Sequence, residues 1–125
     1  MEPICFWAVF ADDYRHGQGG TDLINVHNQV TLIPLEANQS GVTFHRMTLF
    51  VQIAADPGSH VLTFCHEGHE YVQPAKFEVP PESTYVIGVE RDFPVTFSDI
   101  PNINVYPMQL DGVPLGSAYM VSNPL

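Results

Sequence analysis

Basic residues are scarce in this sequence, and their scarcity excludes two classes of partner. Lys and Arg number four against fourteen Asp and Glu, which gives a formal net charge of −10. Nucleic acids and anionic membranes are bound by clusters of Lys and Arg, whereas Arg15, Arg46, Lys76 and Arg91 are scattered along the chain. We therefore expect neither as a direct partner. A basic protein partner is compatible with this charge, but the acidic residues form no block, which favours plain solubility as their role.

Long helical patterns are also missing, and this absence sets the fold class. Almost every apolar run is short and ends at Pro, Gly or Asn, and no stretch sustains the period of about 3.6 residues that a helix requires. The eleven Pro and nine Gly lie at segment boundaries, where turns need them. The sequence therefore predicts an all-β protein, with residues 1–125 forming a single β-sandwich of about seven to nine mostly antiparallel strands.

Export signals and abundant cysteine are lacking as well. Residues 1–10 carry no basic segment and only a short apolar run, so we expect neither a signal peptide nor a membrane span, and a cytoplasmic location. In that compartment the two cysteines, Cys5 and Cys65, are expected to be free thiols. A disulfide between them stays open for an extracellular setting.

The first third of the chain contains two predicted strands and two connections. Ile4–Ala11 is apolar without alternation, which predicts a central strand covered on both faces. The glycine-rich segment Asp12–Asp22 is interpreted as an irregular loop or wide hairpin connection. Leu23–Leu32 alternates as one half-buried strand, with Asn28 on its inward face as a candidate bulge. Pro34–Gly41 is predicted to be a loop.

A hairpin with a specific register is predicted in the middle of the chain. The strands Thr43–Ala55 and His60–His66 flank a turn at Asp56–Ser59 that has Pro and Gly in favourable positions. If the turn closes with Ala55 opposite His60, the aliphatic residues of both strands lie on one face. The predicted pairs are Ile53 with Leu62, Val51 with Phe64, and Leu49 with His66.

The last third contains an edge strand, two core strands and a second hairpin. Tyr71–Val79 is interrupted by Pro74, which is typical of an edge. The remaining predicted strands are Thr84–Glu90, Phe93–Phe97, and the pair Asn102–Leu110 and Leu115–Val121 around a turn at Asp111–Pro114.

The most suggestive cluster for metal chemistry runs from Cys65 to Glu70. It contains the residue types that bind zinc. However, His66 and His69 are three residues apart on a strand end and turn, so they do not match the helical His-Glu-x-x-His motif. We favour turn residues over metal ligands here, and expect no metal and no cofactor. A metal-dependent enzyme using His66 and His69 remains the third functional hypothesis.

A second candidate site directly follows the first strand, at Asp12, Asp13, Tyr14, Arg15 and His16. Paired carboxylates can hold Ca²⁺ or Mg²⁺ or act as acid and base, although adjacent acids at a strand end are typical of a solvated turn. We retain these five residues as a binding candidate. Tyr14, Tyr106 and Tyr119 could line a binding face, while core packing is the favoured role for most aromatic residues.

Two stretches resemble a family of small uncharacterised β-sandwich proteins of bacteria and phages. The first comprises Ala8–Arg15 and, after the glycine-rich loop, Asp22–Asn28. The second comprises Phe93–Phe97 and Val105–Leu110, followed by Asp111-Gly112 and a closing strand. The family has no assigned activity or catalytic residues. The resemblance therefore implies the sandwich and transfers no site residue.

No nucleophile with a suitable base is evident, so we expect no enzymatic activity. The sequence favours a non-enzymatic binding or interaction module with a protein partner, acting through its loops or an exposed edge strand. Asp12–Asp22 and Pro34–Gly41 are the expected contact loops, and homo-oligomerisation through an edge is compatible with the pattern. The alternative is a phage structural protein or an inhibitor that interferes with a host.

Overall fold

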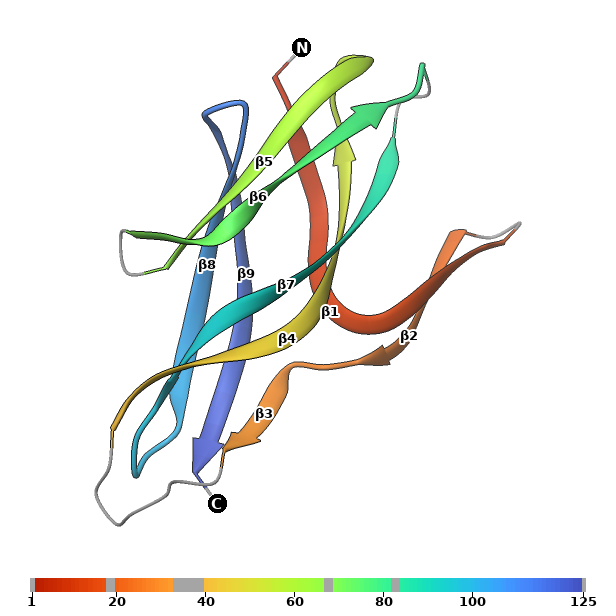
Figure 1. Ribbon diagram of the computed structural model, residues 1–125. Coiled ribbons are helices and arrows are strands. Elements are labelled where there is room, and N and C mark those ends of the chain that lie inside the picture. Colours follow the sequence, from red (N-terminus) through yellow and green to blue (C-terminus); the bar gives the residue numbers. More distant parts are fainter. Residues whose placement is uncertain (1, 18–19, 33–39, 67–68, 82–83, 125) are drawn as a thin grey trace.

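The predicted β-sandwich is confirmed by a computed structural model, in which two mostly antiparallel sheets pack face to face (Figure 1). The structure describes residues 2–17, 20–32, 40–66, 69–81 and 84–124, without the side chains of residues 16–21, 32, 66 and 69–71. The sheet orders are β2-β1-β4-β7 and β3-β9-β8-β5-β6. The nine strands of the described residues are β1 Ile4–Gly17, β2 Gly20–Val26, β3 Gln29–Leu32, β4 Gly41–Ala54, β5 Gly58–His66, β6 His69–Val79, β7 Tyr85–Phe97, β8 Asn102–Leu110 and β9 Val113–Pro124.

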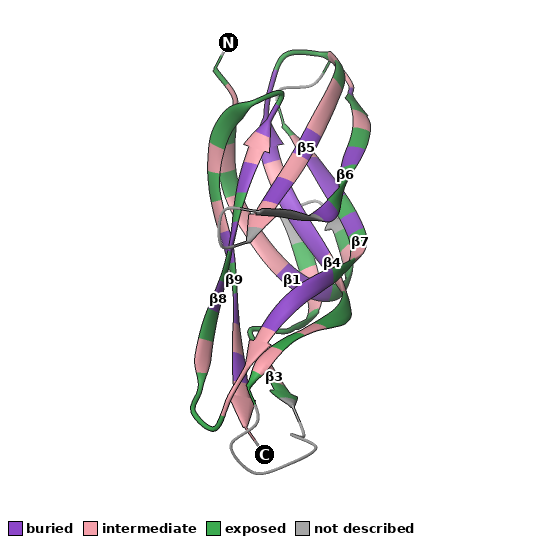
Figure 2. Cartoon of the chain, turned by 60° about the vertical axis from the view of Figure 1, so that its left-hand side comes forward, coloured by how far each residue is buried: buried purple, intermediate pink, exposed green. Residues whose placement is uncertain are grey.

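The core lies between the two sheets and is centred on aromatic rings. Phe93 of β7 makes edge-to-face contacts with Phe10, Phe64 and Tyr106, with ring centroids 5.1–5.5 Å apart. The Tyr106 hydroxyl donates a hydrogen bond to the Pro94 carbonyl at 2.6 Å, and burial raises the pKa of this phenol. Buried and exposed residues alternate along β8 and β9 (Figure 2), as half-buried strands require.

The predicted hairpin between Thr43–Ala55 and His60–His66 is wrong. The strand β4 pairs with β1 and β7, whereas β5 pairs with β6 and β8 in the other sheet. The apolar residues predicted to share a face, such as Val51 and Phe64, are all buried in the core. Alternation identifies which residues are buried, but it does not distinguish a partner beside the strand from one across the core.

The first strand is not covered on both faces as predicted. Ile4 and Phe6 are exposed, and a bulge between Cys5 and Trp7 shifts the register with β4. A smaller apolar cluster on the outer face of this sheet is centred on Phe50. Its members are Ala11, Phe50 and Val86, with Trp7, Tyr14 and Leu23 packed against them.

The segment Asp12–Asp22, predicted to be a loop or wide hairpin connection, is mostly strand. After Phe10, β1 continues to Gly17 and pairs with β2 from Ala11 onward. We name this extension, Asp13–Gly17 and Gly20–Ile24, the β1–β2 arm. In Figure 1 it projects away from the rest of the sandwich.

Leu23–Leu32 is also not the single strand that was predicted. It breaks at His27 and Asn28, so that β2 joins β1 while β3 pairs in parallel with β9 of the other sheet. Asn28 lies in the break, where its carbonyl accepts a hydrogen bond from the Val121 amide at 2.9 Å. The predicted loop Pro34–Gly41 lies largely outside the described residues.

The two strands predicted at Thr84–Glu90 and Phe93–Phe97 form one strand, β7. Its residue Arg91 extends to β6 and donates to the carbonyls of Gln73 and Pro74, at 3.2 and 3.4 Å. These bonds join the two sheets where no ladder connects β6 and β7 in the described residues. Arg91 is partly buried on the same face of β7 as Val89 and Phe93, and these carbonyls accept hydrogen bonds from its guanidinium.

Two other predicted elements are confirmed. The strand β6 is the edge of the five-stranded sheet, and β8 and β9 form an antiparallel hairpin. The turn is tighter than predicted and consists of Asp111 and Gly112, with φ of 51° and 83°. Two consecutive positive φ values are typical of the type I′ turn, whose twist matches that of the strands.

A buried polar network fastens the end of β7 to the β8–β9 hairpin. The Asn104 side chain accepts a hydrogen bond from the Thr96 amide at 2.8 Å and donates to the Met120 carbonyl at 2.9 Å. It also donates to the Ser122 hydroxyl, which in turn donates to the Thr96 carbonyl. Asn104 and Ser122 are the buried polar residues of the described core. Their burial is tolerated because their hydrogen-bonding groups are satisfied.

A second network joins the arch between β4 and β5 to the β8–β9 turn. One ring nitrogen of His60 lies 2.6 Å from an Asp111 carboxylate oxygen and the other lies 2.6 Å from the Asp56 carbonyl. The Asp111 carboxylate also accepts the Val61 amide at 2.8 Å. Both ring nitrogens face acceptors, so the imidazolium form satisfies both contacts and the neutral form only one.

We predict that Asn104→Ala destabilises the protein by about 2 kcal/mol, because the buried Thr96 amide loses its partner. Chemical denaturation would measure the loss. The control Asn123→Ala, which removes an exposed hydrogen bond with Gln29, should change the free energy of unfolding by less than about 0.5 kcal/mol. Equal losses in the two variants would contradict the role assigned to Asn104.

We also predict that the stability depends on pH through His60. Hydrogen bonding to Asp56 and then to Asp111 raises the pKa of His60 above its ordinary 6.5. This contribution is therefore fully present below pH 6.5 and is lost as the pH rises through the raised pKa. Hydrogen bonds from Val61 and His60 lower the pKa of Asp111 below 3.8, so its contribution is lost only in stronger acid.

Measurements of the free energy of unfolding from about pH 4 to about pH 9 should thus show a fall at the alkaline end. His60→Gln should flatten that fall. An unchanged slope in the variant would show that another group carries the pH dependence.

Candidate functional site

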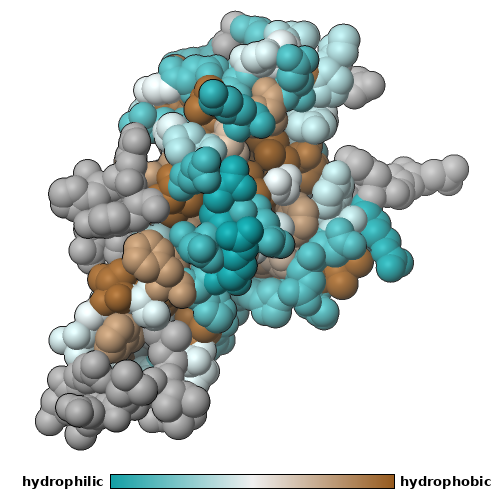
Figure 3. All heavy atoms as spheres, in the orientation of Figure 1, coloured by the Kyte–Doolittle hydropathy of each residue, from teal (hydrophilic) through white to brown (hydrophobic). Residues whose placement is uncertain are grey.

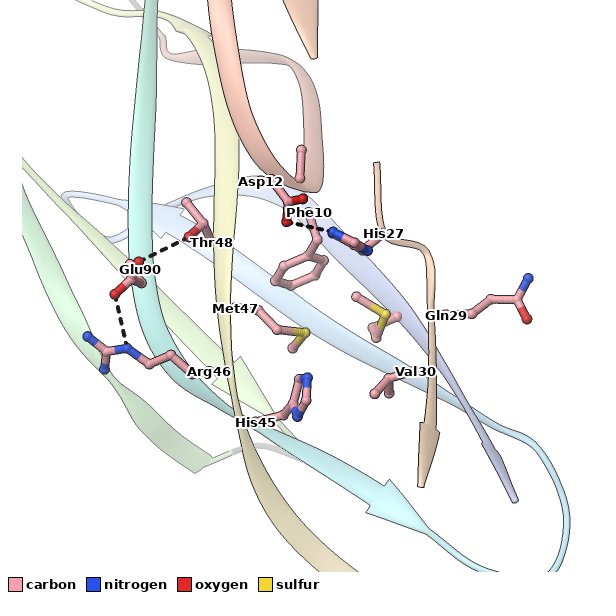
Figure 4. Close-up of a pocket in the computed structure, with 12 residues that line it drawn as sticks. Phe10, Asp12, His27, Gln29, Val30, His45, Arg46, Met47, Thr48 and Glu90 are labelled. Atoms are coloured by element: carbon pink, nitrogen blue, oxygen red, sulfur yellow. Dashed lines mark hydrogen bonds and ion pairs between the residues drawn. The ribbon is translucent and has the colours of Figure 1, made fainter. Parts of the chain in front are cut away.

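A cleft of about 390 Å³ opens where β1 separates from β4. The last residue pair between these strands is Phe10 with Leu49, and from Ala11 onward β1 pairs with β2. Within the described residues, β4 from Gly41 to Thr48 therefore pairs only with β7. On the other side of the opening lies β3, which is bonded to the opposite sheet (Figure 4).

The floor of the cleft is apolar. Phe10 and Met120 are almost completely buried, and Val30 and Met47 pack against the same core. Figure 4 shows Met47 and Val30 pointing into the cleft from β4 and β3. Flexible Met side chains adapt to ligands of different shape, so this floor suits apolar side chains of a partner.

A fixed carboxylate marks one end of the cleft. Asp12 accepts hydrogen bonds from the Asn25 amide at 2.9 Å and from a ring nitrogen of His27 at 2.7 Å. These bonds, that of Asn25 first, lower the pKa of Asp12. Asn25 has a left-handed backbone with φ of 54°, a conformation that Asn tolerates better than most residues.

The other side of β4 presents charges to solvent. Arg46 lies 3.2 Å from Glu90 and 3.6 Å from Asp92, and Thr48 reaches Glu90 at 3.5 Å. In Figure 4 Arg46, Thr48 and Glu90 lie on the side of β4 away from His45 and Met47. Figure 3 shows hydrophilic side chains gathered across the middle of the face that it draws. Since these pairs are exposed, they contribute little to stability.

Of the five residues predicted as a binding site after the first strand, the structure brings only Asp12 into the cleft. Asp13 instead accepts the Tyr14 amide at 2.7 Å, and the Tyr14 ring packs against Phe50 at 5.2 Å. Arg15 is exposed on the arm. The side chain of His16 lies outside the described residues. Of the described side chains, Asp12 thus lies in the cleft and Tyr14 lies against Phe50, so these two do not share a site. Successive residues such as Asp12 and Asp13 point to opposite faces of the strand.

The proposed metal ligands His66 and His69 lie opposite one another in the backbone of the β5–β6 pair. Their side chains lie outside the described residues. Among the side chains that the structure describes, no group of three His, Cys, Asp or Glu residues is placed to hold a metal ion. Cys5 and Cys65 are free, and burial raises the pKa of the Cys5 thiol.

Sequence reasoning missed the contributions of His27, His45 and Met47 to the cleft. They come from the break after β2 and from β4, which are distant in sequence and meet only because β1 changes partner. One signal was present, since Asn25 and Asn28 flank the break and Asn is typical of turns and left-handed backbone. Nothing in the alternation of β4 distinguished the half that pairs with β7 alone in the described structure from the half that also pairs with β1.

Comparisons with known proteins bring no assignment, since no family model, curated protein or solved structure matches this chain. The resemblance to uncharacterised bacterial and phage sandwich proteins thus stays a prediction. Within the described residues, the structure has no helix that could cross a membrane.

We predict that Asn25→Ala raises the pKa of the Asp12 carboxyl toward its ordinary 3.8, because the bond from Asn25 is the main cause of its lowering. An NMR titration of the side-chain carboxyl carbons would measure this. Gln29→Ala is a suitable control, since Gln29 lines the cleft but bonds with Asn123. A pKa of Asp12 that is unchanged in Asn25→Ala would refute the arrangement.

Proposed function

We propose that this protein is a non-enzymatic binding module that takes an extended segment of a protein partner into the cleft by strand addition to β4. The observation that carries the proposal is the edge of β4 from Gly41 to Thr48, which pairs with β7 on one side only in the described structure. A strand edge presents a row of amide and carbonyl groups that an incoming peptide can pair with.

The composition of the cleft supports an extended peptide. Successive side chains of an added strand would point to opposite faces of the sheet. One set would contact the floor of Phe10, Met47 and Met120, and the other would face solvent. The volume of about 390 Å³ accommodates a few side chains, and apolar pockets with a few polar groups are typical of binding sites.

The charges around the cleft favour a partner segment with Lys or Arg. Asp12 and Glu90 both line the opening, Glu90 from the side of β4 where it pairs with Arg46, and the chain carries a net charge of −10. Opposite charge increases the rate of encounter and discriminates against acidic segments. Because these carboxylates are solvent-exposed, their attraction should weaken as salt increases.

The residues that line the cleft are better suited to contacts and hydrogen bonds with a partner than to catalysis. His27 and Asp12 form a hydrogen-bonded pair, yet the described lining contains neither Ser nor Cys to act as their nucleophile, and the hydroxyl of its Thr48 bonds to Glu90 on the other side of β4. A covalent mechanism would need such a group within hydrogen-bonding distance of the imidazole. This composition supports the non-enzymatic proposal.

A random array of ten-residue peptides, probed with the labelled protein, would test the proposal. We expect bound peptides with alternating apolar residues and at least one Lys or Arg. His45→Trp, which fills the cleft with a larger side chain, should weaken binding about tenfold or more. In the complex, amide hydrogen exchange at residues 45–48 should slow, because an added strand protects the edge of β4.

Phe44→Trp provides the matched control, since Phe44 is the neighbouring exposed residue of β4 and does not line the cleft. Its binding should equal that of the wild type. Failure of every peptide to bind, or equal loss of binding in the two variants, would reject strand addition at this edge.

A further inference from the structure

An uncharged apolar surface lies on the side of the five-stranded sheet that faces away from the core. The strands β8 and β9 alternate, so that Asn104, Tyr106 and Met108 are buried while the intervening residues point outward. Cross-strand pairing brings the outward residues together in three rows. We name them the β8–β9 outer face: Ile103 with Val121, Val105 with Tyr119, and Pro107 with Ser117.

The most exposed members of this face are large and apolar. Ile103 is 72% exposed, Tyr119 is 58% exposed and Val105 is 37% exposed. Single exposed apolar residues are ordinary, but neighbouring ones form a patch of the kind found at protein interfaces. Tyr is enriched in such interfaces, since its ring adds apolar area and its hydroxyl can remain hydrated.

Charge is almost absent from this part of the chain. Of the fourteen acidic and four basic residues, only Asp111 lies between residues 100 and 125. It lies in the turn and is bound to His60 and Val61, away from the rows of the outer face. The residues of neighbouring strands that pair alongside, Gln29 and Thr63, are uncharged as well.

We propose that the β8–β9 outer face is the contact surface of a homodimer, in which two copies of this chain cover one another. In a two-fold dimer the same surface of each copy meets itself. Two molecules with a net charge of −10 repel, and like charges brought into direct contact weaken association. A surface without charges is therefore where this acidic chain can best associate with itself.

The same charge distribution argues against a basic protein as the occupant. Such a partner would be attracted by the acidic residues, which lie in the first hundred residues apart from Asp111. The neutral face offers it only apolar contact. A second copy requires only apolar contact and a complementary shape. Two sheet faces provide both when they pack about 10 Å apart.

Salt dependence distinguishes the two occupants. Salt screens the repulsion between two acidic copies, so dimerisation should strengthen as ionic strength rises. Attachment of a basic partner would weaken under the same change. The homodimer also does not depend on the proposed peptide binding, because the cleft lies at the junction of the two sheets and not on this face.

Sedimentation velocity of the full chain, from about 1 to about 200 µM and at about 0.05 and about 0.5 M NaCl, would test the proposal. We expect a species of twice the 13.9 kDa chain mass, whose dissociation constant falls at high salt. Tyr119→Asp and Val105→Asp should each raise that constant about tenfold or more, since each places like charges in the interface.

Phe6→Asp is the matched control, because Phe6 is 55% exposed on the other sheet and the change in charge is the same. It should dimerise as the wild type does, and circular dichroism should show that the variants are folded. A monomer under all conditions would overturn the proposal and leave the face to a different partner. A dimer that survives both variants, or that Phe6→Asp also dissociates, would overturn it too.

Discussion

The separation of β1 from β4 after Phe10 is the constraint on which the rest of the structure depends. Up to this residue β1 pairs with β4, and beyond it β1 pairs with β2 alone in the described residues. Phe10 fixes the point of separation in two ways. Its ring packs against Phe93 and Tyr106 in the core, and its carbonyl accepts the His27 amide at 2.7 Å. The change of partner produces both the arm and the open edge of β4.

Because no ladder joins the two sheets at the cleft among the described strands, contacts elsewhere must hold them together. The Asn104 network bonds β7 to the β8–β9 hairpin, and Arg91 bonds β7 to the carbonyls of β6. The arm is held by Tyr14, whose ring packs against Phe50, while Phe50 lies over Gly88 so closely that a Cβ there would lie 2.9 Å from the ring. These contacts hold the sandwich together without a ladder across the cleft.

The sequence allowed prediction of the elements better than of their partners. The turn at Asp111-Gly112 and the edge strand around Pro74 were predictable, because local backbone chemistry decides both. The pairing of β4 and β5 was not, because Val51 and Phe64 are buried whether their strands lie side by side or face one another. The break at His27 and Asn28 depends on the two sheets offering separate partners, which is a tertiary effect.

The candidate site was predictable only in part for the same reason. Asp12 was identified from its position at a strand end, but its partners Asn25 and His27 come from β2 and the following break. Residues that meet because a strand changes sheets leave no periodic signal. Tyr119 was recognised as a candidate for a binding face, and its exposure follows from the outward position in the alternation of β9.

The strand β9 connects the two proposed surfaces. Met120 points inward to the floor of the cleft, and its neighbour Tyr119 points outward to the β8–β9 outer face. Adjacent residues of a strand face opposite sides, so a dimer formed through Tyr119 would leave the cleft open. Each dimer would then carry two clefts. For a partner with two suitable segments, the second binding event becomes intramolecular, which increases the overall affinity without any new contact.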